Sequence, residues 1–411
     1  MAYLRSAWRG GAMAAAAAGA VLLACGVLWS AGQAGGGKDW PGFLGAQRDG
    51  SSSETGWSTD WGASGPKTLW QAQVGVGYSC VSVSDGKAYT MGNAADVDTV
   101  FCFDAVKGDV IWKKTYPCKG GSYPGPRCSP TVDGARVYTV SIEGLIACWD
   151  AAKETPLWSH KASEYGGNPG NWGFACSPLI LGDRVIVDVG VTVAFNKNTG
   201  ELAWKTPPHK AGYSSPKAFR SGARDLLAVF AGDGLQIFSA DKGEPIAATP
   251  WKTSYDVNAA LPIISGDGIF ITSGYGKGGA LLQLQDKALT KAWEKNELSS
   301  QFSTPVLLEG YLYGVTGNVN GGQSLTCLEL KSGAVKWTAP GSGATILVGG
   351  KLVILGSKGR LAVAQASPDA YKELAATELG AGEWWNAPTL SHGLIYCRSH
   401  QGRLVCLDVR P

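Results

Sequence analysis

The feature that most constrains the fold is a repeat of about 45 residues that runs through most of the chain. A short stretch ending in tryptophan recurs at spacings of 42 to 47 residues, at Trp70, Trp112, Trp158, Trp204, Trp251, Trp293 and Trp337. Between these tryptophans, a Ser-Pro step is followed by short apolar segments of alternating pattern, separated by glycine turns. Strands of period two joined by such turns form antiparallel meanders of four strands.

The number of repeats follows from the first turn of each unit. There are eight such turns: Asp85-Gly86, Asp133-Gly134, Gly182-Asp183, Ser221-Gly222, Asp267-Gly268, Glu309-Gly310, Gly349-Gly350 and His392-Gly393. The eighth unit reaches the end of the sequence without room for an outer strand, whereas a spare strand, residues 67–71, precedes the first unit. We therefore predict an all-β fold: an eight-bladed β-propeller of four-stranded antiparallel blades, with the last blade closed by the N-terminal strand.

Composition excludes several classes of function. The 36 Lys and Arg nearly balance the 33 Asp and Glu, and no basic run is interleaved with aromatic residues, so we expect no nucleic-acid partner. The four histidines do not stand at metal-ligand spacing, and we predict no metal site. A glycine-rich stretch, residues 274–279, lacks the Lys-Ser/Thr ending of a P-loop and is expected to be a hairpin tip.

Residues 1–34 have the pattern of a signal peptide or a lipoprotein signal and anchor. Two arginines precede an apolar stretch of small residues that ends in Leu-Leu-Ala-Cys-Gly, which resembles a lipobox with Cys25 as the lipidated residue. The alternatives are an export signal cleaved near Ala31 or Ala34, or an uncleaved anchor. All three place the rest of the chain outside the cytoplasm, in the periplasm or outer envelope, with membrane contact only through this segment.

The remaining sequence divides into residues 35–66, predicted to pack on the propeller, and residues 67–411, the propeller itself. Two cysteine pairs are candidates for disulfides: Cys118 with Cys128, which flank a Gly/Pro-rich loop, and Cys397 with Cys406, which face each other across a turn. One position of the repeat, two residues before an acid or Asn, is a cysteine in four units, which indicates a packing role. These are Cys102, Cys148, Cys327 and Cys406.

Candidate site residues follow from propeller geometry. The connections from each outer strand to the next inner strand share one face, and two of them, residues 116–127 and 165–172, are long. We expect the ligand or partner face to carry Tyr78, Tyr123, Arg127, Tyr165, Trp172, Tyr213, Asn258, Gln301, Trp385 and Asn386. These aromatic rings can stack on a flat ligand or a sugar while Arg127 binds a carboxylate or phosphate. Alternatively they fill the channel and tie neighbouring blades together, or a partner strand or loop docks on the rim.

The spacing Asp-x-x-x-Gly-x-x-x-Trp, as from Asp104 to Trp112, resembles the repeat of pyrroloquinoline-quinone (PQQ) type propellers. The resemblance covers nearly everything from Trp40 onward and is most specific at residues 40–45, 48–50, 125–127, 273–276 and 366–369. These motifs are similar to those of exported bacterial PQQ-binding-like propellers, the BamB-like group of the quinoprotein alcohol dehydrogenase-like superfamily. Leu44 departs from the arginine that the group usually carries at this position.

The resemblance implies two functions. Quinoprotein dehydrogenases need Ca²⁺ held by several oxygens and an ionised Asp, and they carry adjacent cysteines over the cofactor. This chain has no Cys-Cys pair and no Cys-x-x-Cys-His haem motif, and the nearest acids we can place are Asp256 and Glu383. We therefore predict a monomeric, non-catalytic binding or scaffolding module of the cell envelope, without cofactor, for a protein or glycan partner. The alternative is a PQQ-dependent dehydrogenase that oxidises an alcohol or a sugar, with PQQ and Ca²⁺ as cofactors.

Overall fold

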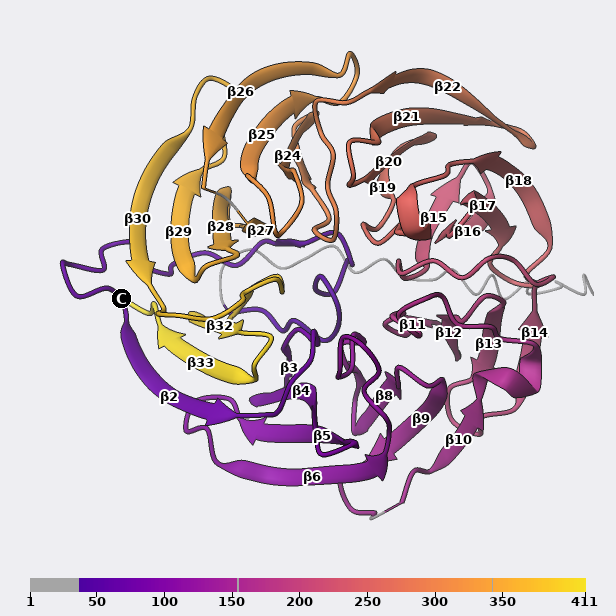
Figure 1. Ribbon diagram of the computed structural model, residues 1–411, viewed down its shortest axis with the longest axis horizontal. Helices are drawn as coiled ribbons and strands as arrows, with labels where there is room; N and C mark the ends of the chain where they lie inside the picture. The colour runs from indigo at the N-terminus through magenta and orange to yellow at the C-terminus, as the bar shows by residue number, and fades with distance from the viewer. Residues whose placement is uncertain (1–36, 154, 342) are drawn as a thin grey trace, which may run out of the picture. The chain divides into compact units, whose positions relative to one another are not determined.

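The computed structural model describes residues 37–411, apart from residues 154 and 342. Within this part of the chain the strands form eight sheets arranged as a ring (Figure 1). Each sheet has four antiparallel strands, and one sheet gains a short fifth strand. The predicted eight-bladed, all-β propeller is confirmed.

The first four blades follow in chain order, each from its inner strand outward. Blade 1 has β3 (Ser82–Ser84), β4 (Lys87–Ala94), β5 (Val97–Asp104) and β6 (Val110–Pro117). Blade 2 has β7 (Thr131–Asp133), β8 (Arg136–Val140), β9 (Leu145–Asp150) and β10 (Trp158–Lys161). Blade 3 has β11 (Leu179–Leu181), β12 (Arg184–Asp188), β13 (Thr192–Asn196) and β14 (Leu202–Lys205). Blade 4 has β15 (Lys217–Ser221), β16 (Arg224–Ala231), β17 (Gly234–Ser239) and β18 (Pro245–Pro250).

The other four blades complete the ring. Blade 5 has β19 (Ile263–Ser265), β20 (Gly268–Ser273), β21 (Gly278–Gln285) and β22 (Ala288–Lys295). Blade 6 has β23 (Val306–Leu308), β24 (Tyr311–Thr316), β25 (Ser324–Glu329) and β26 (Ala334–Pro340). Blade 7 has β27 (Gly343–Val348), β28 (Lys351–Gly356), β29 (Arg360–Gln365) and β30 (Lys372–Glu378), and blade 8 has β31 (Thr389–Ser391), β32 (Leu394–Arg398) and β33 (Arg403–Asp408). Two 3-10 helices, η1 (Ala162–Tyr165) and η2 (Ser254–Asp256), lie in connections between blades.

The outer strand of blade 8 comes from the other end of the propeller sequence. Strand β2 (Lys67–Gln73) pairs antiparallel with β33, from Lys67 opposite Asp408 to Gln73 opposite Arg403. The predicted shared blade is confirmed, and the strand is two residues longer than expected. Trp70 on β2 then donates its indole N–H to the carbonyl of Ala105 in blade 1, at 3.1 Å.

The Asp-Gly-Trp spacing of the repeat is explained by the contact between blades. The carboxylate of Asp104 accepts the N–H groups of Val106 and Lys107, at 3.0 and 2.8 Å, and this fixes the turn before β6. Gly108 follows with a φ of 78°, and a Cβ there would lie 2.5 Å from the Trp70 ring. The same close approach of glycine to the tryptophan of the preceding blade recurs at Gly200 with Trp158 and Gly243 with Trp204. The motif therefore defines the blade-to-blade interface.

A chain of hydroxyl groups links the starts of the inner strands. The N–H of Cys80 donates to Ser129 Oγ, that of Ser129 to Ser177 Oγ, and that of Ser177 to Ser215 Oγ, each at 2.9 Å. Each bond crosses from one blade to the next. The Ser-Pro steps are therefore structural, because the hydroxyl satisfies an inner-strand N–H of the preceding blade.

The cysteines of the repeat also have a packing role. Cys102, Cys148, Cys327 and Cys406 are fully buried, and each lies opposite a tyrosine of the neighbouring strand. Burial raises the pKa of the Cys148 thiol to about 11. These thiols therefore pack in the interior of the blades and are not reactive groups.

Neither disulfide expected from the sequence is present. Cys397 lies opposite Val405, whereas Cys406 lies opposite Tyr396, so the two cysteines occupy adjacent register positions and point to opposite faces of the sheet. Cys118 is also a free thiol. Cys128 Sγ instead accepts the N–H of Val140, at 3.3 Å. Register parity therefore separates Cys397 from Cys406.

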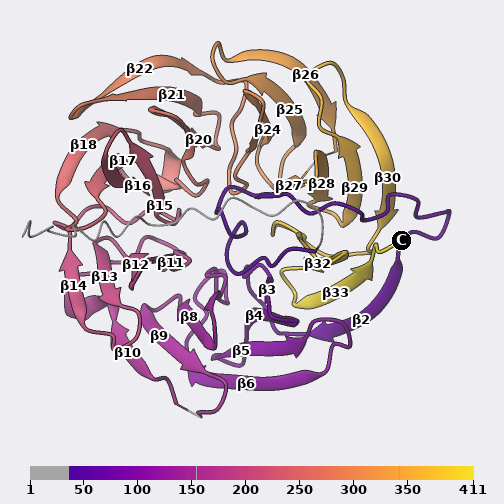
Figure 2. The same ribbon diagram turned by 180° about the vertical axis from the view of Figure 1, so that it is seen from behind.

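Residues 37–66 cross the middle of the ring on the side seen in Figure 2, where the segment is indigo. Trp40 exchanges two backbone hydrogen bonds with Val83, each 2.8 Å long. The carboxylate of Glu54 accepts the N–H of His392 at 2.9 Å, and β1 (Ser51–Ser52) pairs in parallel with β27. The side chain of Arg48 is buried and donates to two carbonyls of the segment that leads into β11.

Cys25 and the rest of the predicted targeting segment lie outside the described residues. Within the residues that the structure does describe, no helix is long and apolar enough to span a bilayer.

Candidate functional site

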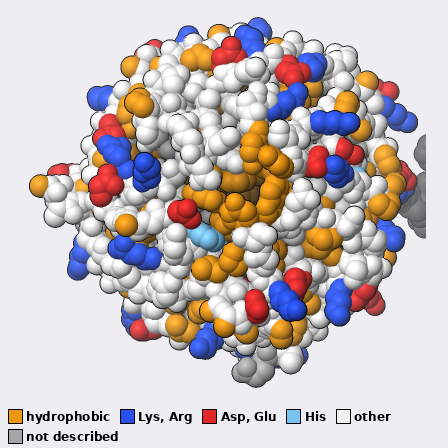
Figure 3. All heavy atoms as spheres, viewed as in Figure 1, with side chains coloured by type: hydrophobic (Ala, Val, Ile, Leu, Met, Phe, Trp, Pro, Cys, Tyr) orange, Lys and Arg blue, Asp and Glu red, His pale blue; other side chains and the backbone are white. Residues whose placement is uncertain are grey.

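A cavity of about 430 Å³ lies where the channel of the ring meets the face of the blade-to-blade connections. The segments leading into the inner strands of seven blades contribute to its wall, and blade 7 contributes through β27 itself. Figure 3 shows hydrophobic side chains gathered at the centre of this face. Eight of the ten residues predicted for the face line the cavity: Tyr78, Tyr123, Arg127, Trp172, Tyr213, Gln301, Trp385 and Asn386.

One side of the cavity is a stack of planar groups. The Tyr78 ring lies between the guanidinium of Arg127, whose Cζ is 5.3 Å from the ring centroid, and the imidazole of His400, at 4.5 Å and 18°. Trp385 stacks beside Tyr78 at 5.7 Å, and Phe302 continues the series at 6.0 Å from Trp385. The loop before blade 2 therefore delivers a cation to an aromatic surface built by blades 8, 1 and 6.

Burial sets the electrostatics of this side. It lowers the pKa of Arg127 and of His400, and it raises the pKa of Tyr78 to about 12. The Tyr78 hydroxyl is buried and has no hydrogen-bond partner among the described residues. Arg398 lies behind the stack and donates to the carbonyls of Ser79 and Gly75, at 3.2 and 3.0 Å. Its pKa is lowered to about 10 because its charge is removed from water.

The opposite side of the mouth carries a second group of aromatic rings. Trp172 lies 5.8 Å from Tyr213 and 6.0 Å from Tyr255, and Tyr255 lies 5.7 Å from Tyr275. The Tyr213 hydroxyl accepts the N–H of Trp172 at 3.3 Å. Tyr275 stands at the turn between β20 and β21, so the hairpin tip predicted for residues 274–279 is confirmed.

Sequence reasoning missed several residues of the cavity. Tyr275 lines the cavity, and Tyr255 stands beside it next to Trp172. Their φ values of 60° and 65° are rare for aromatic residues, and no local sequence pattern predicts them. Phe43 and Leu44 reach the cavity from the N-terminal segment. Leu44 thus contributes an apolar wall where the PQQ-binding-like group usually has arginine.

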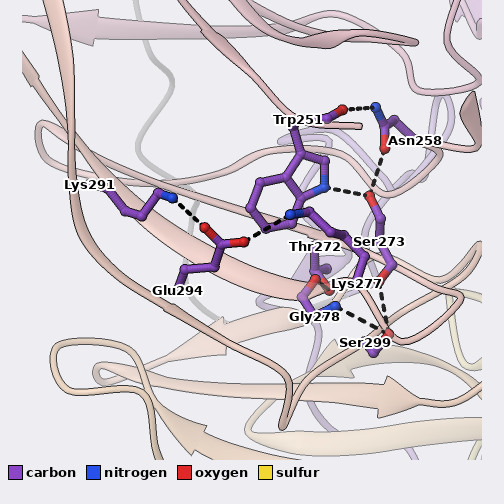
Figure 4. Close-up of polar contacts among 9 residues, drawn as sticks. All are labelled: Trp251, Asn258, Thr272, Ser273, Lys277, Gly278, Lys291, Glu294 and Ser299. Carbon is purple, nitrogen blue, oxygen red and sulfur yellow. Dashed lines mark hydrogen bonds and ion pairs between the residues drawn. The ribbon is translucent and has the colours of Figure 1, made fainter. Parts of the chain in front are cut away.

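Asn258 does not line the cavity but ties blade 4 to blade 5 (Figure 4). Its Nδ2 donates to the carbonyls of Ala231 and Trp251, at 2.8 and 3.2 Å, and its Oδ1 accepts the Ser273 hydroxyl at 2.7 Å. The Trp251 indole N–H donates to the same hydroxyl at 3.0 Å. Lys277 lies 4.1 Å over the Trp251 ring, so the network is covered by a cation on its outer side. For this residue, the interpretation as a tie between blades holds.

Tyr165 also lies away from the cavity. It ends η1, its hydroxyl is 3.0 Å from His160 Nδ1, and its ring meets Phe195 edge-on at 5.1 Å. Tyr165 therefore packs against blades 2 and 3 and leaves the cavity to Trp172 of the same connection.

The residues present do not fit PQQ with Ca²⁺. Neither predicted acid lines the cavity: Asp256 pairs with Lys210 at 2.7 Å, and Glu383 accepts the amide of Gln401 at 3.4 Å. In the described part of the chain, no three His, Cys, Asp or Glu side chains are grouped so that they could hold a metal ion. Ca²⁺ requires several oxygen ligands, so we derive no catalytic step through this pair.

Together these features define an eight-bladed propeller of the PQQ-like, BamB-like class with an aromatic cavity at one mouth of its channel. A family model described as outer membrane protein assembly factor BamB matches residues 117–339, which is more than half of the chain. The chain therefore belongs to this family. No sequence among the curated proteins matches it.

Solved structures support the fold. The crystal structure of BamB from Moraxella catarrhalis is similar with a TM-score of 0.62 and 12% identity, over 84% of this chain and 99% of that one. Quinohemoprotein alcohol dehydrogenase from Comamonas testosteroni is similar with a TM-score of 0.66 and 12% identity, over 90% and 80% of the two chains. A europium-containing methanol dehydrogenase gives 0.64 and 13%, over 90% and 89%.

Proposed function

We propose that this protein is a non-catalytic binding or scaffolding module of the cell envelope, whose protein or glycan partner docks on the face that carries the cavity. The observation that carries this proposal is the cavity itself: it is lined by aromatic rings and one cation, and it holds no carboxylate that could act as a base. Aromatic anchors and arginine are the side chains that dominate binding energy at interfaces. The family description, which names an outer membrane protein assembly factor, favours a protein partner.

The proposed location rests on two further observations. The family description names an assembly factor for outer membrane proteins, and residues 1–34 have the pattern of an export signal with Cys25 at the lipidation position. We propose that the chain is exported as a monomer and is held to a membrane only through this segment.

Loss of capture tests the docking face. The full chain is immobilised and exposed to an envelope extract in three forms: wild type, Arg127→Ala with Trp172→Ala, and a control with Arg220→Ala and Leu202→Ala. The control residues are exposed and belong to β15 and β14, outside the cavity. We expect wild type and control to retain the same partner and the cavity variant to lose it at an unchanged melting temperature. Equal capture by all three would exclude this face.

The second candidate function is that of a PQQ-dependent dehydrogenase. The similarity in fold to quinohemoprotein alcohol dehydrogenase is the observation that favours it. Titration of the full chain with PQQ and Ca²⁺, followed by calorimetry and tryptophan fluorescence, separates the two. The account predicts no saturable binding, because no carboxylate lines the cavity to hold Ca²⁺ or to act as a base. Saturable micromolar binding would favour the oxidoreductase, and assays on alcohols and aldose sugars would follow.

A further inference from the structure

We propose that the cavity receives an acidic segment of a partner polypeptide, which inserts one bulky apolar side chain among the aromatic rings and places a carboxylate against Arg127. This inference rests on the proposed function, because it names the chemistry by which a protein partner would be recognised on this face. Three observations lead to it: the apolar wall, the positive charge of Arg127 and the exposed aromatic rim.

The wall of the cavity suits an apolar side chain. Tyr78, Trp172 and Trp385 present rings at the mouth, while Phe43 and Leu44 close the cavity from the N-terminal segment. A cavity of about 430 Å³ lined in this way can bury a Leu or Phe side chain completely. Sugar hydroxyls placed against Phe43 and Leu44 would instead lose their hydrogen bonds to water without replacement. Side-chain amides such as Gln301 and Asn386 also line the cavity, but the part closed by Phe43 and Leu44 favours an apolar anchor over a saccharide.

The charge on the lining of the cavity is positive, and no carboxylate forms a hydrogen bond with it. Arg127 is the only charged side chain among the lining residues. In the described part of the chain, the hydrogen bonds of Arg127 and Arg398 go to backbone carbonyls and not to carboxylates. Glu383 lies near His400 and Tyr78, but it does not line the cavity. Arg127 is half-buried, so its charge is partly removed from water, and an incoming carboxylate would form charge-assisted hydrogen bonds with it.

Arg127 is also held ready for such a contact. Its Nη1 donates to the carbonyl of Gly125 and its Nη2 to that of Tyr123, both at 3.0 Å, while Tyr78 supports the plane of the guanidinium. These bonds use two of the five N–H donors of a guanidinium. The side chain thus needs little ordering on binding, and its remaining donors can bond a carboxylate.

The rim extends beyond what a small anion would cover. Tyr255 is 62% exposed and Tyr123 is 47% exposed, and they stand on connections that lead into different blades. Tyr255 keeps a left-handed backbone conformation at this exposed position. Exposed aromatic side chains around a central pocket match an extended polypeptide, which contacts the rim on both sides of its anchor.

Matched peptides test the inference on the full chain by isothermal calorimetry. The probe is a heptapeptide with blocked ends, in which Phe is flanked on each side by two Asp. Its partners carry Asn for every Asp, Lys for every Asp, or Ala for Phe, and trigalacturonate is the acidic saccharide. We expect the Asp–Phe peptide to bind about ten-fold tighter than the Asn or Ala peptide, and the Lys peptide not to bind. Raising the salt concentration should weaken only the Asp–Phe peptide.

Variants assign the preference to the cavity. Arg127→Gln should remove the preference for Asp over Asn, and Arg127→Lys should keep part of it. Trp172→Ala should weaken the Asp and Asn peptides by the same factor. Arg220→Gln, at an exposed guanidinium paired with Asp225, is the control and should change nothing. The salt series on wild type needs no variant, so it remains decisive if Arg127→Gln does not fold.

Other results would overturn the inference. Equal binding of the Asp and Asn peptides, no binding of any peptide, or tighter binding of trigalacturonate would each do so. The capture experiment fails or succeeds separately. A captured partner with no peptide preference would leave the docking face intact and remove only the acidic segment. Peptide binding without any captured partner would remove the proposed function instead.

Discussion

Two residues from the connections that lead into inner strands, Asn258 and Tyr78, are used in different ways. Each lies in the connection that leads into the inner strand of its blade, β19 for Asn258 and β3 for Tyr78. The Asn258 amide is fully buried and bonds to groups of blades 4 and 5. The Tyr78 hydroxyl has no partner in the described part of the chain, and its ring faces the cavity between Arg127 and His400. Tyr78 stands four residues before its strand and Asn258 five, and Ala259, at the position that matches Tyr78, lines the cavity. A shift of one residue along the connection therefore separates a residue that holds blades together from one that faces a ligand.

The largest loss of stability is expected from opening the ring, because the contacts between neighbouring blades depend on its closure. Deleting residues 67–73 removes β2 and leaves β33 with an unpaired edge and Gly108 without the Trp70 ring. We expect the deletion to abolish cooperative unfolding, because the joint between blades 8 and 1 is lost. Thermal and urea unfolding followed by circular dichroism would measure this. A deletion variant that melts as cooperatively and as high as the full chain would contradict the shared blade.

Removal of the Asn258 amide should be next in size. Asn258→Ala leaves the Ser273 hydroxyl and the carbonyls of Ala231 and Trp251 short of a partner, and we expect a loss of about 3 kcal/mol in the free energy of unfolding. Asn386→Ala is the matched control, because Asn386 makes one bond, to the carbonyl of Ser79 at 3.2 Å, and should cost about 1 kcal/mol. Equal losses in urea unfolding would show that Asn258 is no more structural than a cavity residue.

A titratable pair lies at another contact, between blade 3 and the connection that leads from it to blade 4. His209 Nε2 lies 2.7 Å from Asp188 Oδ1, and both side chains are 3% exposed. Burial acts to lower the pKa of His209, but the charge and hydrogen bond of Asp188 outweigh it and raise the pKa above 6.5. The stabilisation is thus fully present below the unfolded pKa and is lost as pH rises through the folded value.

We expect His209→Gln to remove this pH dependence, which is on the order of 1 kcal/mol. Unfolding by urea at several pH values from 5.5 to 9 measures it for the variant and for wild type. His392→Gln is the control, since His392 pairs with Asp39 at an exposed position. Wild-type stability that rises across this range, with the variant following the same curve, would show that the pair contributes nothing.

The smallest change in stability is expected for Tyr78→Phe, and it bears most directly on the comparison of Tyr78 with Asn258. Tyr78→Phe removes a buried hydroxyl that has no partner, so the free energy of unfolding should stay within about 0.5 kcal/mol of wild type or rise slightly. Denaturant unfolding tests this. A loss comparable to that of Asn258→Ala would mean that Tyr78 holds the blades together as Asn258 does.

The repetitive part of the molecule could be predicted from the sequence because each signal recurs. Trp70 and Gly108 belong to a motif seen several times, and the count of turns required the strand that closes blade 8. Repetition also placed Arg127 and Trp172 at the mouth of the channel, where the structure finds them. For such residues, the position in the repeat was sufficient to predict where they lie in the propeller.

The rest depends on features that occur once. Tyr275 reaches the site with a left-handed backbone conformation, and Leu44 reaches it through the path of the N-terminal segment. The pair Cys397 and Cys406 was predicted wrongly because a shift of one residue in register turns a side chain to the other face of the sheet. Local conformation and register are set by tertiary packing, which periodicity does not report.

The most direct test of the docking face compares two equally exposed positions. A photoreactive amino acid replaces Tyr123 at the mouth of the cavity or Leu202 on β14, each 47% exposed. After irradiation in intact cells, the account predicts a cross-linked partner from position 123 that is absent when Trp172 is also changed to Ala, and none from position 202. Equal products from both positions, or a product from 202 alone, would contradict the assignment of the cavity face as the binding surface.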